Sequence, residues 1–74
     1  MDDKHYKVFA QIGLNILYYR KEQGITQQEL AEITSFSRNH IQQIETAKAT
    51  PSVVALIDIA EALKIPVGKL FESR

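Results

Sequence analysis

A run of hydrogen-bonding side chains near the middle of the chain is the part of this sequence best suited to specific recognition. It follows Ser37 in the segment SRNHIQQIETAKATP. On a helix that turns about 100° per residue, four of its polar side chains share one side: Asn39, Gln42, Gln43 and Thr46. Such amides can bind adenine edges in a DNA groove, and the neighbouring Arg38 can bind guanine. The residues alone are equally compatible with a solvated helix face, although such faces usually carry more Lys and Glu.

Catalytic and metal-binding chemistry find little support in the residue types. The chain has no cysteine, and His5 and His40 are far apart in the sequence. Ser37 and His40 have i, i+3 spacing on one helix, but no acid is placed to complete a nucleophilic site. We therefore expect a protein that is not an enzyme, with no catalytic residue, no metal site and no cofactor.

Two short helices are predicted to position the polar side chains. Thr26 and Glu29 match the Thr-x-x-Glu capping box, so a helix is expected to begin after Thr26. Its predicted inward residues are Leu30, Ala31 and Ile33. Residues 34–36 form the corner, and Ser37 is the predicted N-cap of a second helix that runs to about Thr46.

Three further helices are predicted around this pair. The first runs from about His5 to Glu22 and stops at Gly24. Its core stripe is Phe9, Ile12, Ile16 and Tyr19. Ser52 caps a later helix. The apolar face of that helix is predicted to be Val53, Leu56, Ile57, Ala60 and Leu63. Pro66 opens a fifth, short helix. Its apolar positions are Val67, Leu70 and Phe71.

Length and composition set the remaining bounds. With 74 residues and 45% hydrophobic content, the chain is expected to form one domain over residues 1–74, all-α and compact, with five helices. The start MDDKHYK is unlike a signal peptide, and no apolar run is long enough to cross a membrane, so a cytoplasmic protein is expected. The formal net charge of zero argues against a strongly basic, non-specific nucleic-acid binder.

The ordered set of residues from about Ile12 to Phe71 resembles a known family. The carriers are Ile12-Gly13, Ile16 to Arg20, Gly24-Ile25-Thr26-Gln27, Glu29-Leu30-Ala31, Ser37, Ile41, Ile44-Glu45, Lys48, Pro51-Ser52, Leu56, Ile59-Ala60, Ala62-Leu63, Ile65-Pro66-Val67 and Leu70-Phe71. This set is similar to the helix-turn-helix domains of the Cro and lambda-repressor type, the XRE family. The resemblance implies a lambda-repressor-like fold in which helices two and three form the helix-turn-helix, with helix three in the major groove of double-stranded DNA.

The resemblance also implies roles for single residues. It assigns base contacts to Arg38, Asn39 and Gln43, whereas the helical spacing adds Gln42 to this set. Phosphate contacts are expected from Gln27, Ser37, His40, Thr46 and Lys48. A partly buried salt bridge is expected between Arg20 and Glu45, which would leave the predicted DNA face locally positive.

Three positions depart from the family pattern. Ser35 stands where a glycine commonly turns the corner, and Ala47 where a glycine commonly ends the recognition helix. Helix three is therefore expected to end differently or to extend slightly, which affects the position of Lys48. Phe36 in the corner is interpreted as core packing in preference to a contact with DNA.

Two apolar surfaces remain to be assigned. The resemblance implies a homodimer formed by the last helices, with Val67, Leu70 and Phe71 at the interface. A second apolar stripe on the first helix consists of Ala10, Leu14, Leu17 and Tyr18. This stripe either packs inside the domain or meets a partner, and internal packing is favoured.

Together these expectations describe a DNA-binding transcriptional regulator, interpreted as a repressor of a near-palindromic operator. One alternative with the same fold is an antitoxin or the controller of a restriction-modification system. The other is a protein-interaction module that has lost DNA binding, as the zero net charge would allow. Expected partners are double-stranded DNA, a second copy and a protein such as a toxin or an anti-repressor, but no membrane.

Overall fold

The computed structural model describes residues 3–73, so residues 1, 2 and 74 of the predicted domain 1–74 lie outside the described residues. The described residues form four α-helices and two 3-10 helices. In chain order these are η1 (Asp3–His5), α1 (Tyr6–Glu22), α2 (Gln27–Thr34), α3 (Arg38–Glu45), α4 (Val53–Ala62) and η2 (Val67–Phe71). The expected all-α class is therefore correct, whereas the expected count of five helices is not.

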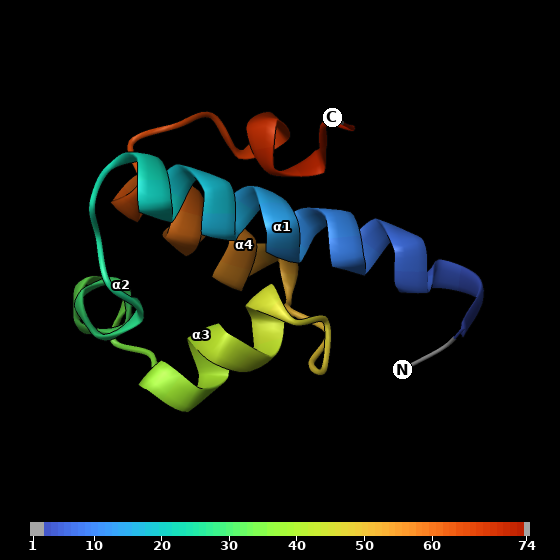
Figure 1. Cartoon of the computed structure of the whole chain (residues 1–74), viewed down its shortest axis with the longest axis horizontal. Helices are drawn as coiled ribbons and strands as arrows, with labels where there is room; N and C mark the ends of the chain where they lie inside the picture. Colours follow the sequence, from blue (N-terminus) through green and yellow to red (C-terminus); the bar gives the residue numbers. More distant parts are fainter. Residues whose placement is uncertain (1–2, 74) are drawn as a thin grey trace.

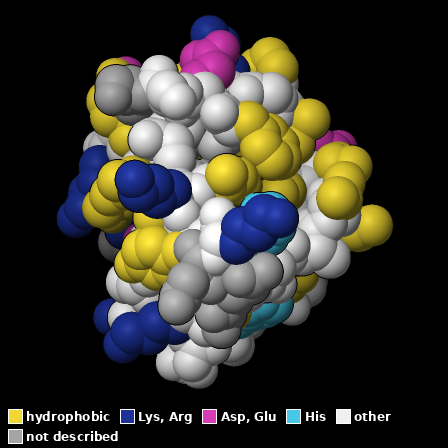
Figure 2. All heavy atoms as spheres, turned by 90° about the vertical axis from the view of Figure 1, so that its right-hand side faces the viewer, with side chains coloured by type: hydrophobic (Ala, Val, Ile, Leu, Met, Phe, Trp, Pro, Cys, Tyr) yellow, Lys and Arg dark blue, Asp and Glu magenta, His cyan; other side chains and the backbone are white. Residues whose placement is uncertain are grey.

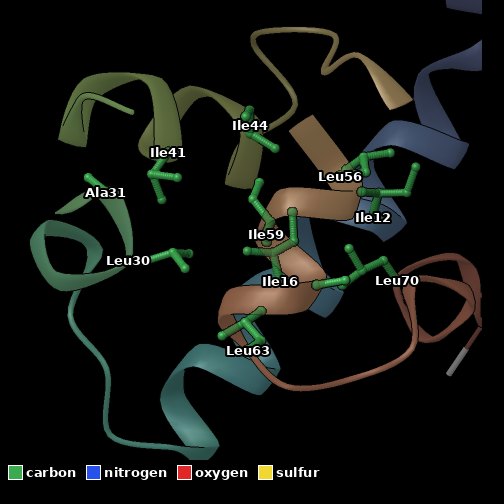
Figure 3. Packing of buried hydrophobic residues seen from close by; sticks show 11 residues of the cluster. Ile12, Ile16, Leu30, Ala31, Ile41, Ile44, Leu56, Ile59, Leu63 and Leu70 are labelled. Atoms are coloured by element: carbon green, nitrogen blue, oxygen red, sulfur yellow. The ribbon is translucent and has the colours of Figure 1, made fainter. Parts of the chain in front are cut away.

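The long helix α1 crosses the whole molecule, and the other elements pack around it (Figure 1). In this view α4 lies behind α1, η2 lies above it and α3 lies below it, while α2 is seen end-on beside α3. The apolar side chains of these elements converge on one core (Figure 3). Its buried members are Ile12, Ile16, Leu30, Ala31, Ile41, Ile44, Leu56, Ile59, Ala60, Leu63 and Leu70.

The predicted N-caps are present at three helices. In the capping box of α2, the Glu29 amide donates to Thr26 Oγ1 at 3.0 Å, and the Thr26 amide donates to Glu29 Oε1 at 2.9 Å. The hydrogen bond from the Thr26 amide lowers the pKa of the Glu29 carboxyl. Ser37 and Ser52 cap α3 and α4 with their side chains alone, each accepting from a backbone amide at 3.0 Å. Local sequence thus fixes where these helices begin.

The corner and the end of α3 adopt the glycine-like backbone although neither residue is glycine. Ser35 has φ 64° and Ala47 has φ 59°. At Ala47 the helix closes as a Schellman motif, because the Lys48 amide donates to Gln43 O at 2.8 Å. The expectation that α3 ends differently or extends is therefore wrong, and Lys48 comes two residues after the C-cap Thr46.

The predicted fifth helix is a 3-10 turn. Lys69 N donates to Pro66 O at 3.0 Å, which is an i to i+3 hydrogen bond. The side chain of Asn15 on α1 donates to Leu70 O at 2.9 Å and to Glu72 O at 2.8 Å. Because α1 supplies the donors for these carbonyls, the segment is held by α1 and not by its own α-helical bonds.

Several apolar residues predicted to face the core are exposed. Ile33 on α2 is 59% exposed, and Val53 and Ile57 on α4 are 69% and 41% exposed. In the second stripe of α1, Leu14 and Tyr18 are exposed, whereas Ala10 and Leu17 are partly buried, so the expected internal packing holds for only part of the stripe. A helical period identifies the apolar side of a helix, but a domain this small has too few neighbouring elements to cover the full width of that side.

Between residues 3 and 73, no helix combines the length and apolar character that a membrane crossing requires.

Candidate nucleic-acid interface

The helix α3 has a buried inner side and a polar outer side. Ile41 and Ile44 on the inner side are fully buried, and Glu45 is 7% exposed. Among the polar candidates on this helix, Arg38 and Asn39 are exposed, whereas Gln42 and Gln43 are partly buried. The core therefore fixes the rotation of α3 about its axis and determines which side chains point outward.

A buried ion pair ties α3 to α1. Arg20 Nε donates to Glu45 Oε2 at 2.7 Å, and Arg20 Nη2 donates to Glu45 Oε1 at 3.1 Å. Both side chains are nearly inaccessible, with exposed fractions of 6% and 4%. The remaining Arg20 Nη1 donates to the carbonyl of Ile25, in the turn before α2. The expected pair is present, in bidentate geometry, and it connects the three helices that hold the recognition surface.

Gln27 belongs to the same network. Its Nε2 donates to Glu45 Oε1 at 3.0 Å, which fixes the orientation of the amide. A primary amide carries two N–H groups, so one remains to bind an acceptor such as a phosphate oxygen.

A polar hollow of about 540 Å³ lies between the C-terminal part of α1, the start of α2 and α3. It is lined by Leu17, Arg20, Lys21, Thr26, Gln27, Gln28, Arg38, Gln42, Glu45 and Thr46. The structure therefore brings together Gln27, Arg38, Gln42 and Thr46 from the expected set. The others, namely Ser37, Asn39, His40, Gln43 and Lys48, do not line this hollow.

The uncompensated charge at this surface is positive. Arg20 and Glu45 neutralise each other, so Lys21 and Arg38 are the remaining charges that line the hollow. Lys48 is exposed just beyond the end of α3. Among residues 4–73, whose side chains the structure describes, these three cations take part in no ion pair. A chain with zero net charge can thus present a locally positive surface, because Glu45, the only acid among the described residues that line the hollow, is paired with Arg20.

The hydroxyl groups on α3 differ in what they can still donate. Ser37 Oγ accepts from the His40 amide at 3.0 Å, so its proton is free for a phosphate oxygen. Thr46 donates its proton to Gln42 O at 2.9 Å, which weakens its case as a phosphate donor. His40 lies beside Phe36, with ring centroids 5.1 Å apart, and Phe36 packs against the core as interpreted.

Three polar residues that line the hollow are not among the predicted site residues, namely Lys21, Thr26 and Gln28. Lys21 could have been predicted from the sequence, because it directly follows Arg20 and shares the last turn of α1 with it.

In the described part of the chain, no group of His, Cys, Asp or Glu side chains is placed to hold a metal ion. Hydrogen bonding and positive charge are therefore the chemistry that this surface offers.

Comparison with known proteins places the chain in a family. The model of the helix-turn-helix family HTH_3 matches residues 16–70. An uncharacterised helix-turn-helix transcriptional regulator of Sinorhizobium fredii is 32% identical over 54 residues, which cover 73% of this chain and 70% of that protein. The immunity repressor of Bacillus phage phi105 is 37% identical over 59 residues, or 80% of this chain but only 41% of that protein.

Solved structures agree with this placement. The restriction-modification controller protein C.AhdI from Aeromonas hydrophila superposes with a TM-score of 0.86 at 26% identity, over 89% of this chain and all of that chain. The biofilm regulator SinR, solved in complex with DNA, gives a TM-score of 0.76 at 32% identity over 82% of this chain and 98% of that chain. The chain therefore belongs to the Cro/C1-type helix-turn-helix family, the XRE family, whose members are DNA-binding transcriptional regulators and not enzymes.

Proposed function

We propose that this protein is a sequence-specific repressor that binds a near-palindromic operator as a homodimer, with α3 in the major groove. The observation that carries the proposal is the fixed rotation of α3. Buried Ile41 and Ile44 and the ion pair of Glu45 hold its inner side, so its polar outer side is presented on a rigid backbone. Rigid presentation is what direct readout of base edges requires.

The proposed base contacts are Arg38, Asn39 and Gln43, with Gln42 beside them. Arg38 and Asn39 occupy the first turn of α3, and the first turn of a recognition helix is the part that reaches base edges. Gln43 lies one turn further on the same outer side. Each bidentate contact of this kind contributes roughly 1 to 3 kcal/mol of discrimination between bases.

The proposed phosphate contacts flank these residues. Ser37 and Gln27 each keep a proton that can be donated to a phosphate oxygen. Lys48 and His40 supply charge or a ring N–H at the two ends of the outer side, and Thr46 is the weakest member because its proton is engaged. Contacts of this type set the register of the protein on DNA without reading the sequence.

The proposed dimer surface combines η2 with α4. Val67 and Phe71 of η2 are exposed. The exposed apolar residues of α4 are Val53, Val54 and Ile57. Hydrophobic side chains gather at the upper right of Figure 2, the side toward η2 and α4. Leu70, which was expected at this interface, is fully buried and belongs to the core. A two-fold axis here would separate the two recognition helices by about 34 Å, one turn of DNA.

Selection of randomised duplex DNA by the purified protein, followed by sequencing, tests the proposal. We expect enrichment of an inverted repeat with half-sites about one helical turn apart. Enrichment of a single half-site would contradict the dimer. Recovery of no motif would overturn the proposal in favour of an interaction module that has lost DNA binding.

Two matched variants distinguish base contacts from phosphate contacts on the selected operator. Gln43→Ala should cost about 1 to 3 kcal/mol and relax the preference at one base pair in each half-site. Lys48→Ala should weaken binding to all sequences alike and reduce the salt dependence. Equal, sequence-independent losses in both variants would contradict the assignment of Gln43 to a base.

A second candidate is the control of a restriction-modification operon. It is favoured by the match to C.AhdI, because this chain covers the whole of that chain at similar size. A selected motif that recurs beside a restriction or methyltransferase gene would support it. A motif beside a toxin gene would instead favour an antitoxin, with the toxin as the protein partner.

A further inference from the structure

The outer side of α1 carries an apolar hollow that adjoins the polar hollow beside α3 and shares no residue with the proposed dimer surface. It encloses about 620 Å³ and is lined by Leu14, Leu17, Tyr18, Lys21 and Glu22. Leu14 is 55% exposed and Tyr18 is 45% exposed. On the opposite side of α1, Ile12 and Ile16 are fully buried. The hollow is therefore a second apolar side of this helix, left open to solvent.

Two lysines lie on either side of Leu14 along α1, each seven residues away from it. Lys21 lines the hollow itself, and Lys7 lies beyond its other end. Seven residues are about two helical turns, so both lysines lie on the same side of α1 as Leu14, each roughly 10 Å away along the axis. Both are exposed, and neither forms an ion pair with any of residues 4–73, whose side chains the structure describes.

The only acid in the described lining of the hollow, Glu22, does not lie between the two lysines. Glu22 accepts a hydrogen bond from the Tyr18 hydroxyl at 3.2 Å, at the edge of the hollow. By helical spacing it lies to one side of the line from Lys7 to Lys21. Along that line the surface is apolar in the middle and positive at both ends.

We propose that the hollow on α1 binds an acidic amphipathic helix of a partner protein. The apolar side of that helix would cover Leu14, Leu17 and Tyr18, and its carboxylates, spaced by about four turns, would pair with Lys7 and Lys21. The same charges disfavour a second copy of this chain. Antiparallel packing about Leu14 would place Lys7 against Lys21 of the other copy, and parallel packing would place each lysine against its equivalent.

A helix bound in the hollow would also affect the neighbouring DNA surface. Leu17 and Lys21 line both the apolar hollow and the polar hollow beside α3. A bound acidic helix would engage Lys21 and bring negative charge to the edge of the surface that faces phosphates, which disfavours DNA binding. The partner would thus act as an anti-repressor, a step that rests on the proposed function, whereas binding of the helix does not.

Selection from a displayed helical scaffold with randomised surface positions tests the binding step on the purified full chain. We expect the retained helices to carry Asp or Glu on both sides of an apolar stripe. Binding of a retained helix, made as a synthetic peptide, should fall at least tenfold with Leu14→Gln and about threefold with Lys7→Gln. Val8→Gln is the matched control, because Val8 is also exposed on α1 but lies outside the hollow, and it should leave binding unchanged.

Three results would overturn the binding step. They are retention of basic helices or of none, equal binding by the Leu14→Gln variant, and a smaller oligomer of that variant in light scattering, which would identify the occupant as a second copy. Thermal unfolding checks that Leu14→Gln folds like the parent chain, as expected for an exposed side chain.

Competition on the selected operator tests the coupling. A saturating amount of the retained peptide should weaken DNA binding of the parent chain at least tenfold, and should leave DNA binding of the Leu14→Gln variant unchanged. Unchanged DNA binding of the parent chain would overturn the anti-repressor step. Failure of the parent chain to bind any DNA without peptide would instead count against the proposed function and leave the peptide measurements standing.

Discussion

The helix α1 meets its neighbours through two buried polar contacts of different kinds. At its C-terminal end, Arg20 forms a bidentate ion pair with Glu45 of α3. Nearer its middle, the fully buried Asn15 donates to the carbonyls of Leu70 and Glu72 in and after η2. The first contact is charged and joins side chain to side chain. The second is neutral and joins a side chain to backbone.

The two contacts differ because the α1–α3 junction and the α1–η2 junction hold different kinds of segment. The ion pair orients α3, whose outer side chains are proposed to read DNA. Removal of either partner is expected to destabilise the fold strongly, because the other partner remains as an unpaired buried charge. The amide of Asn15 holds a segment too short to form its own α-helix, and it does so by occupying carbonyls that have no helical donor. We therefore expect the α1–α3 junction to govern stability and the α1–η2 junction to govern the shape of the dimer surface.

Removal of Glu45 should have the largest effect. Glu45→Ala leaves Arg20 buried without its carboxylate, and we expect a loss of about 3 to 5 kcal/mol in the free energy of unfolding, measured by urea denaturation. Glu61→Ala is the control, because Glu61 is exposed on α4 and should change stability by less than about 0.5 kcal/mol. An unfolding midpoint of Glu45→Ala equal to that of the control would mean that the ion pair does not hold the junction.

A steric change tests the same junction without changing any charge. The added Cβ of Gly13→Ala would lie 2.4 Å from Glu45 O and 2.7 Å from Ile44 O, both backbone atoms of α3. Since backbone cannot yield easily, we expect a loss of about 2 to 3 kcal/mol despite the better helix propensity of alanine. Gly68→Ala is the control, because a Cβ there would meet nothing within 4 Å. Retained stability in Gly13→Ala would show that α1 and α3 can move apart, contrary to a rigid junction.

The two junctions also differ in how far the sequence predicts them. Gly13, Arg20 and Glu45 belong to a recognisable family pattern, and that pattern predicts the ion pair. Asn15 gave no such signal, because one polar residue among apolar ones on a helix reads as a solvated position. Its role depends on a carbonyl of Glu72, which lies 57 residues away in sequence, and local patterns carry no information about such a contact.

The same limit explains the other outcomes. Caps depend on neighbouring residues only, and Thr26, Ser37 and Ser52 cap helices as predicted. Coverage of an apolar side depends on the rest of the fold, and Ile33 and Val53 are exposed for that reason. The outer side of α3 could be predicted from helical spacing, but the hollow beside it could not, since Lys21 and Thr26 come from other elements.

The α1–η2 junction is tested by Asn15→Ala. This change removes the donor to two carbonyls in a buried site, and we expect a loss of about 2 kcal/mol, which is smaller than the loss from Glu45→Ala. The expected second effect is weaker dimerisation in sedimentation equilibrium, because Val67 and Phe71 lie on the segment that Asn15 holds. Asn39→Ala makes the same substitution at an exposed site and should leave both properties unchanged. If the Asn15→Ala variant dimerises as strongly as the parent chain, η2 does not belong to the dimer surface.

The smallest expected effect comes from Gln11→Ala. Gln11 Nε2 donates to Asn15 Oδ1 at 3.0 Å, which fixes the side of the amide that faces α1 and leaves Nδ2 to face η2. The carbonyls of η2 already select this orientation, because a flipped amide would set oxygen against oxygen. We therefore expect a loss of only about 0.5 to 1 kcal/mol, the net contribution of one hydrogen bond, with dimerisation retained. A loss as large as that of Asn15→Ala would mean that the two amides act as one unit, and a double variant would then lose no more than either single variant.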